Sequence, residues 1–119
     1  MSNLFFAHCD EAAADALAAV YRGRGWSTVV SAAHAPDAVE QVSAAQPVAA
    51  VFCLDGECVD EVNALAAKIV GNPDCGNPLM LFVSGSPDDV VKARSIAPYG
   101  LFVSAEELPW VLKRLVVKT

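Results

Sequence analysis

Several short, reactive side chains stand at the ends of apolar runs in this 119-residue chain. His8, Cys9 and Asp10 follow the run LFFA, while Cys53 and Asp55 lie at the end of the run VAAVFCLDG. The two carboxylates could form a weak Mg²⁺ site, because that ion prefers oxygen ligands and keeps several of its waters. The imidazole and the two thiols are instead the ligand types of a transition-metal site, but no C-x₂-C or similar clustered spacing accompanies them. The alternative without a functional role is that the acids are solvated and the cysteines are small core residues.

Common catalytic motifs are missing around these residues. Cys9 is followed by Asp10 and Glu11, whose charges would repel phosphate and disfavour a thiolate. The opening turn has no G-x-G-x-x-G pattern, and the chain contains no C-x-x-C pair. No nucleophile and base can be paired from the sequence, so we predict that the protein is not an enzyme.

The elements that must position these side chains alternate between strand and helix. Short apolar runs predict strands, and segments with apolar residues at helical spacing and capping residues predict helices between them. The predicted strands cover residues 4–7, 26–30, 48–54, 79–83 and 101–103, and the predicted helices cover 11–22, 36–46, 60–70, 86–97 and 104 onward. This alternation predicts a single α/β domain over residues 1–119, a (βα)₅ three-layer α/β/α sandwich with a parallel five-stranded sheet.

A parallel sheet of this type binds ligands beyond the carboxyl ends of its strands, near the point where the strand order reverses. In the flavodoxin-like order 2-1-3-4-5 that point lies between the first and third strands. The candidate pocket therefore consists of residues that follow the strands, namely His8, Cys9, Asp10, Cys53, Asp55, Ser84 and Ser104.

Four stretches carry a resemblance to a known family over essentially the whole chain. They are FFAHCDEAAADALAAVYRGRGW, AAQPVAAVFCLDG, NPLMLFVSGSPDD and YGLFVSAEEL. Together they resemble the receiver domain of bacterial response regulators, the CheY-like fold of two-component signal transduction and phosphorelays. The resemblance implies a metal-binding acidic pair after strand one, a phospho-accepting Asp after strand three, a hydroxyl residue after strand four and a Lys after strand five.

The chain departs from that pattern at most of these positions. Ungapped spacing places the acidic pair on His8 and Cys9, the phospho-acceptor on Cys53 and the lysine on Ser104, whereas Ser84 matches the hydroxyl position. The resemblance therefore implies a pseudo-receiver, a signalling module that has lost its phosphorylation site and acts through protein–protein interaction. It then needs no cofactor.

Two alternatives remain open. A shifted register would make Asp55 the phospho-acceptor, with Asp10 as its acidic partner and Mg²⁺ as the cofactor. A redox- or metal-responsive sensor could instead use His8, Cys9 and Cys53, for example through a Cys9–Cys53 disulfide. Cys75 lies in a loop rich in glycine and proline, and we expect it to be the most exposed thiol.

Charge and composition limit the classes of partner that we expect. The formal net charge is −6, which argues against nucleic-acid binding, and no apolar run is long enough to span a membrane. No signal peptide is visible at Met1, so we expect a cytoplasmic protein whose cysteines are reduced. By the resemblance, the face formed by the fourth helix, the fifth strand and the fifth helix would bind a protein partner or a second copy, and Tyr99 and Trp110 lie on those segments.

Overall fold

The computed structural model describes residues 3–32, 35–54, 59–104 and 106–117, in which five parallel strands form one sheet in the order β2-β1-β3-β4-β5. The strands are β1 (Asn3–His8), β2 (Ser27–Ala32), β3 (Ala49–Cys53), β4 (Leu79–Val83) and β5 (Leu101–Val103). The α-helices are α1 (Glu11–Arg22), α2 (Ala38–Ala45), α3 (Val59–Val70), α4 (Pro87–Ile96) and α5 (Leu108–Val117), and a 3₁₀ turn covers Pro73–Cys75. The predicted (βα)₅ architecture and strand order are confirmed.

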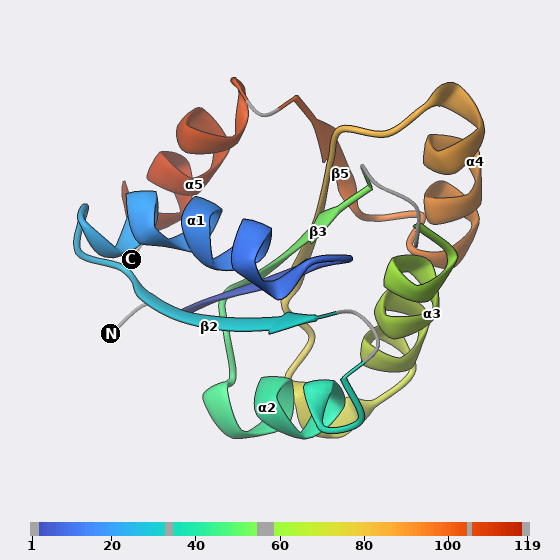
Figure 1. Ribbon diagram of the computed structural model, residues 1–119, viewed down its shortest axis with the longest axis horizontal. Coiled ribbons are helices and arrows are strands. Elements are labelled where there is room, and N and C mark those ends of the chain that lie inside the picture. The colour runs from blue at the N-terminus through green and yellow to red at the C-terminus, as the bar shows by residue number, and fades with distance from the viewer. Residues whose placement is uncertain (1–2, 33–34, 55–58, 105, 118–119) are drawn as a thin grey trace.

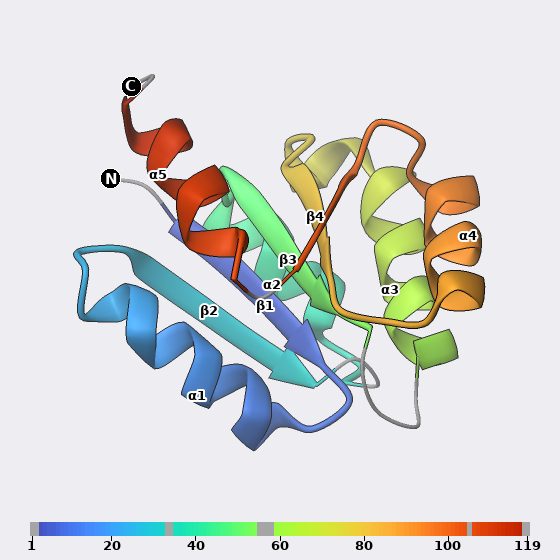
Figure 2. The same cartoon turned by 90° about the horizontal axis from the view of Figure 1, so that it is seen from above.

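The helices divide unequally between the two faces of the sheet. Helices α1 and α5 lie on one face, and α2, α3 and α4 lie on the other (Figures 1 and 2). Each face has its own buried core, because alternate side chains of a strand point to opposite sides. We call these the two-helix face and the three-helix face.

The three-helix face is built around a row of phenylalanine rings. Phe5, Phe52, Phe82 and Phe102 come from β1, β3, β4 and β5. Successive rings have centroids 6.3, 5.4 and 5.1 Å apart, and the last two pairs are stacked. Strand β3 lies at the centre of this row and all five of its residues are buried, which explains its uninterrupted apolar sequence.

Side-chain caps lie at or just ahead of the starts of α1, α4 and α5. The Asp10 side chain accepts a hydrogen bond from the Ala12 amide at the start of α1. Ser86 forms a reciprocal capping box with Asp89 at the start of α4, and Ser104 forms the same arrangement with Glu107 ahead of α5. The Ser86 box agrees with the predicted start of α4, whereas the Ser104 box lies ahead of α5, which begins at Leu108, four residues later than predicted.

Several element boundaries differ from the sequence prediction by one to four residues. Strand β2 begins at Ser27 rather than at Trp26, because the Trp26 amide donates to the Tyr21 carbonyl in the turn that ends α1. The predicted loop after α3 contains a short 3₁₀ turn, which the Asn72 side chain caps by accepting from the Asp74 amide. Among the described helices, none combines the length and apolar character that a membrane span requires.

Candidate functional site at the carboxyl ends of the strands

Strands β1 and β3 are direct neighbours, so their carboxyl ends meet. Ala7 pairs with Phe52 in the parallel register, which puts His8 and Cys53 next to one another one residue further on. Side chains alternate along a strand, so both residues belong to the side of Phe6 and Val51, which is the two-helix face. The topology therefore brings together two of the residues singled out from the sequence.

Cys53 is a buried residue at the end of the central strand. It is 4% exposed and pairs with Val83 of β4 on its other side. The next residue, Leu54, donates its amide to the Val83 carbonyl at 2.9 Å and is buried in the core of the three-helix face. Leu54 thus continues the hydrogen bonding of the strand, and Cys53 is the last side chain of β3 on the two-helix face.

The β1–α1 turn is organised by short-range hydrogen bonds. The Asp10 amide donates to His8 Nδ1 at 2.9 Å, and Asp10 Oδ1 accepts from the Ala12 amide at 3.0 Å. Accepting this bond requires a lone pair on His8 Nδ1, so a neutral His8 carries its proton on Nε2. One carboxylate oxygen of Asp10 is committed to the N-terminus of α1, where the helix dipole also favours a negative charge.

The loop after β4 makes a tight approach to Leu54. Ser84 and Gly85 both have left-handed backbone conformations, with φ of 65° and 106°. A Cβ atom added to Gly85 would lie 2.8 Å from Leu54 Cβ, so a side chain does not fit there without movement. Ser84 is exposed beside this contact.

The position after β5 is used for helix capping. Ser104 Oγ accepts from the Glu107 amide, and the Ser104 amide donates to Glu107 Oε1. The Ser104 hydroxyl thus gives the Glu107 amide an acceptor, and the Glu107 carboxylate gives the Ser104 amide one, just ahead of α5. This residue occupies the place that the resemblance assigns to lysine, and it contributes a short neutral side chain.

The cysteines correct three expectations. Cys9 is disulfide-bonded, which contradicts the expectation that the cysteines are all reduced. Cys53 and Cys75 both retain thiols, so neither is the partner of Cys9 and the Cys9–Cys53 disulfide is wrong. Cys75 is completely buried under α2 rather than exposed, since the 3₁₀ turn folds its loop inward. Burial raises the pKa of the Cys75 thiol, and the neighbouring Asp74 charge raises it further.

The structure tests metal binding only among the described residues. Among the described residues, no cluster of three or more His, Cys, Asp or Glu side chains is placed to hold a metal ion. Asp55, the candidate phospho-acceptor and second Mg²⁺ ligand, lies outside the described residues. The Asp10–Asp55 site therefore stays a prediction.

Large apolar side chains are exposed on the segments predicted to form the partner surface. Tyr99 is 95% exposed, Trp110 is 71% exposed and Val91 of α4 is 66% exposed. Leu101 of β5 joins them with a smaller exposed fraction. We call this set on α4, β5, α5 and the loop before β5 the α4–β5–α5 surface.

Sequence reasoning missed a second surface feature, a groove on the two-helix face. It is lined by Tyr21, Arg24, Trp26, Pro109, Trp110, Leu112 and Lys113. The signal available in the sequence was that Trp26 follows a basic turn and that Trp110 lies near the start of the last helix. Only the fold brings these segments together.

No protein-family model matches the sequence, and no match was found among curated proteins. Solved structures do match its fold. A chemotaxis protein of Vibrio cholerae is 10% identical, with 96% of this chain and 98% of that chain covered at a TM-score of 0.74. A putative response regulator of Chloroflexus aurantiacus is 17% identical, with 98% of both chains covered at a TM-score of 0.70. A CheY-like receiver domain of Methanospirillum hungatei is 15% identical, with 99% and 95% covered at a TM-score of 0.73.

At these identities the likeness concerns the fold, and it extends over almost the full length of both chains in each case. The chain has the receiver fold that response-regulator signalling modules use. The predicted sheet order and the predicted likeness to receiver domains are confirmed. The chemistry at the carboxyl ends of the strands has to be argued from this chain's own residues.

Proposed function

We propose that this protein is a receiver-like signalling module that does not take up a phosphoryl group and acts by binding another protein. The receiver fold supports the signalling role. The thiol of Cys53 at the end of β3, beside the position of His8, carries the proposal. Phosphoryl transfer to a receiver requires a carboxylate nucleophile and a divalent cation held by further carboxylates.

The described residues supply little of that chemistry. A buried thiol offers no oxygen to Mg²⁺, and an imidazole is a poor ligand for that ion. Asp10 follows His8 by two residues, and its side chain already caps α1. Ser104 bonds with Glu107 and carries no positive charge that could respond to a phosphoryl group.

The α4–β5–α5 surface supports a binding role. Its exposed tyrosine, tryptophan and aliphatic side chains are the types that concentrate binding energy when a partner covers them. Strand β5 is the edge of the sheet and is only three residues long, which limits strand-to-strand pairing with another chain. We therefore propose side-chain packing, with a protein partner or a second copy, at this surface.

Phosphoryl uptake can be tested directly. The protein is incubated with Mg²⁺ and either acetyl phosphate or beryllofluoride, and adducts are measured by intact-mass spectrometry and fluorine NMR. We expect no adduct. Stoichiometric modification that disappears in Asp55→Asn would contradict the proposal and establish the alternative, a phosphorylatable receiver that uses Asp55 and Mg²⁺.

The proposed surface is tested with charged substitutions. Tyr99→Glu and Trp110→Glu should each weaken self-association in sedimentation, or capture of a partner once one is identified. Val20→Glu is the matched control, because Val20 is a half-exposed apolar residue on α1, away from this surface. Equal effects of all three substitutions would argue against a specific interface.

The Cys9 disulfide favours a second candidate function, a redox-responsive module. Formation of the bond joins two thiols and releases two protons and two electrons, which a low-molecular-weight disulfide can accept by becoming two thiols. Because Cys9 directly precedes the α1 cap Asp10, the state of the bond could change how α1 is held.

Peptide mapping without reduction, before and after treatment with dithiothreitol, tests this candidate and identifies the partner cysteine. We expect one bond involving Cys9, with a reduction potential near that of the glutathione pool, and no such bond in Cys9→Ser. Cys75→Ser is the control and should leave the bond intact. A protein recovered with four thiols after exposure to oxidised glutathione would contradict the redox hypothesis.

A further inference from the structure

The groove on the two-helix face is formed where two distant parts of the chain come together. Tyr21 ends the buried stripe of α1, Arg24 and Trp26 follow in the turn to β2, and residues 109–113 belong to the first turns of α5. The groove has a volume of about 390 Å³, within the range of roughly 300–1,000 Å³ typical of ligand-binding sites. We call it the α1–α5 groove.

Its lining is unusually rich in residues that dominate protein interfaces. Both tryptophans of the chain and one of its two tyrosines are among the lining residues. Tryptophan, tyrosine and arginine are the side chains most often found as binding hot spots, because they bury large area and also form polar or cationic contacts. The groove is therefore well suited to binding a partner's side chain rather than to remaining covered by water.

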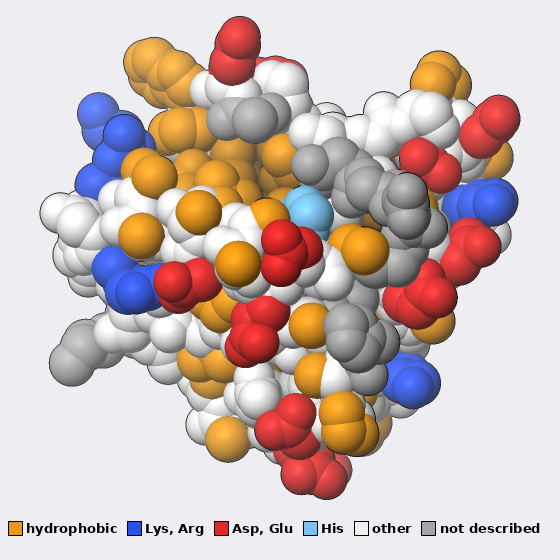
Figure 3. Space-filling model, viewed as in Figure 1, with side chains coloured by type: hydrophobic (Ala, Val, Ile, Leu, Met, Phe, Trp, Pro, Cys, Tyr) orange, Lys and Arg blue, Asp and Glu red, His pale blue; other side chains and the backbone are white. Residues whose placement is uncertain are grey.

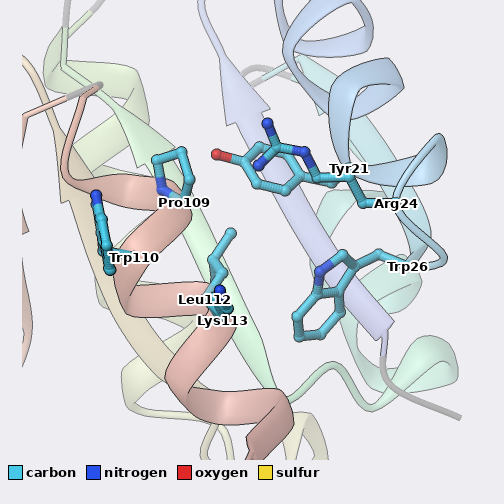
Figure 4. A pocket seen from close by; sticks show the side chains of 7 residues that line it. All are labelled: Tyr21, Arg24, Trp26, Pro109, Trp110, Leu112 and Lys113. Atoms are coloured by element: carbon cyan, nitrogen blue, oxygen red, sulfur yellow. The ribbon is translucent and has the colours of Figure 1, made fainter.

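The walls of the groove are fixed because two of their residues pack into the hydrophobic core. Tyr21 is buried and stacks on Phe6 with ring centroids 5.7 Å apart, and Leu112 is buried on the opposite wall. Figure 4 shows the Trp26 ring on the α1 side facing Leu112 and Lys113 across the groove, and the Tyr21 hydroxyl pointing toward Pro109. A ligand would thus meet preformed aromatic and aliphatic walls.

The charge of the groove is opposite to that of the protein. The formal net charge of the chain is −6, yet the charged lining residues are Arg24 and Lys113, with no acid among them. Arg24 lies over the Tyr21 ring, 5.8 Å from its centroid. The ion pairs between described residues are Arg22–Asp15 and Lys92–Asp60, so Arg24 and Lys113 remain available for a partner's carboxylates.

The space-filling view agrees with this description. Hydrophobic side chains are visible in a hollow between α1 and α5, and Lys and Arg side chains gather beside it (Figure 3). The two cations come from different elements, α5 and the α1–β2 turn, so a segment bound along the groove can place an acid on each of them.

From this combination we infer that the α1–α5 groove binds an acidic peptide segment of a partner protein, with an aromatic or large aliphatic side chain seated between Trp26 and α5 and flanking carboxylates placed on Arg24 and Lys113. This surface is distinct from the α4–β5–α5 surface, although Trp110 borders both, and the inference does not depend on how the carboxyl ends of the strands behave.

The two tryptophans provide the measurement. An array of short peptides, each with one Phe, Tyr or Leu between pairs of Asp or Glu, is titrated against the protein while its tryptophan fluorescence is recorded. Matched peptides carry Lys or Ser in place of the acids. We expect saturable binding of the acidic peptides, no measurable binding of the lysine peptides, and weaker binding as salt is raised, because the contacts with Arg24 and Lys113 are exposed to screening.

Substitutions in the exposed cations locate the site without disturbing the core. The double variant Arg24→Glu and Lys113→Glu should lower affinity for the acidic peptides by at least 10-fold, which corresponds to about 1.4 kcal/mol. Lys68→Glu, an exposed lysine on α3, is the control and should leave affinity unchanged. Circular dichroism confirms that the variants remain folded.

Three results would overturn the inference. The first is failure of every acidic peptide to bind at millimolar concentration. The second is binding that the double variant and Lys68→Glu weaken equally. The third is self-association that the double variant abolishes, which would make a second copy of the chain the occupant. A positive result in the phosphoryl-uptake experiment would leave this inference standing, so the two proposals fail separately.

Discussion

The two faces of the sheet are closed to different degrees. On the three-helix face, α2, α3 and α4 cover a row of four phenylalanine rings, and the core includes long aliphatic side chains from two of those helices. On the two-helix face, α1 and α5 cover smaller side chains, and the α1–α5 groove is left between them. Two helices contribute less covering surface than three, so aromatic side chains remain accessible at the groove.

The unequal closure of the two faces indicates where this protein can bind a ligand without losing stability. A packed row of rings loses contacts if anything moves, because protein interiors have few spare voids. A groove with fixed walls and exposed rims can accept a ligand with little rearrangement. We therefore expect substitutions on the three-helix face to affect folding, and substitutions at the groove to affect binding.

The largest effect should come from the centre of the phenylalanine row. Phe52→Ala removes the ring that contacts both Phe5 and Phe82, and we expect a loss of about 3–5 kcal/mol in the free energy of unfolding. Trp110→Ala, at a mostly exposed ring on the two-helix side, should cost less than about 1 kcal/mol. Urea denaturation followed by circular dichroism measures both losses, and equal losses would contradict the proposed difference between the two faces.

A smaller effect is expected where the three-helix core meets the β4–α4 loop. Gly85→Ala would force an alanine into φ of 106° and bring its Cβ to 2.8 Å from Leu54 Cβ. We expect destabilisation of about 1–3 kcal/mol. Gly25→Ala is a useful control, because Gly25 has a similar φ of 98° but open space around it, so the difference between the two variants isolates the contact with Leu54.

One residue of the three-helix face should be improvable. Asn63 of α3 is buried, and neither its Nδ2 nor its Oδ1 has a hydrogen-bond partner. Asn63→Leu should raise the free energy of unfolding by about 1–2 kcal/mol, because an unsatisfied buried amide is removed. Asn63→Asp should lower it. Thermal unfolding of the two variants gives the comparison, and a lower melting temperature for Asn63→Leu would mean that the amide has a partner in solution.

The smallest effect concerns the wall of the α1–α5 groove. Burial raises the pKa of Tyr21 above its ordinary value of 10.0, and the charge of Arg24 partly offsets that rise. The folded protein therefore holds the Tyr21 proton more tightly than the unfolded chain, so the contribution of Tyr21 to stability is fully present below pH 10.0 and is lost as pH rises through the folded pKa. Denaturation measured across this range should show a fall in the free energy of unfolding with rising pH, and Tyr21→Phe should reduce that fall.

Much of the fold could be predicted from local sequence. The uninterrupted apolar run before Cys53 indicated a central strand, and the Ser86 and Ser104 boxes marked the starts of α4 and α5, because capping and alternation act over a few residues. Burial of Cys75 could not be predicted, since a loop of turn residues does not reveal which way it folds. The disulfide at Cys9 was missed for a similar reason, because bonding depends on where a distant cysteine is placed.

Residue types and ungapped spacing were enough to predict, through the family resemblance, that His8, Cys9, Cys53 and Ser104 stand where receiver domains carry their phosphoryl chemistry, and that assignment stays a prediction. The sequence by itself also determined the overall negative charge and the order of strands and helices along the chain. That Trp26 and Arg24 share a groove with Lys113 and Leu112 could be learned only from the folded structure. These residues are separated by more than two-thirds of the chain, and only the docking of α1 and α5 on one face of the sheet makes them neighbours.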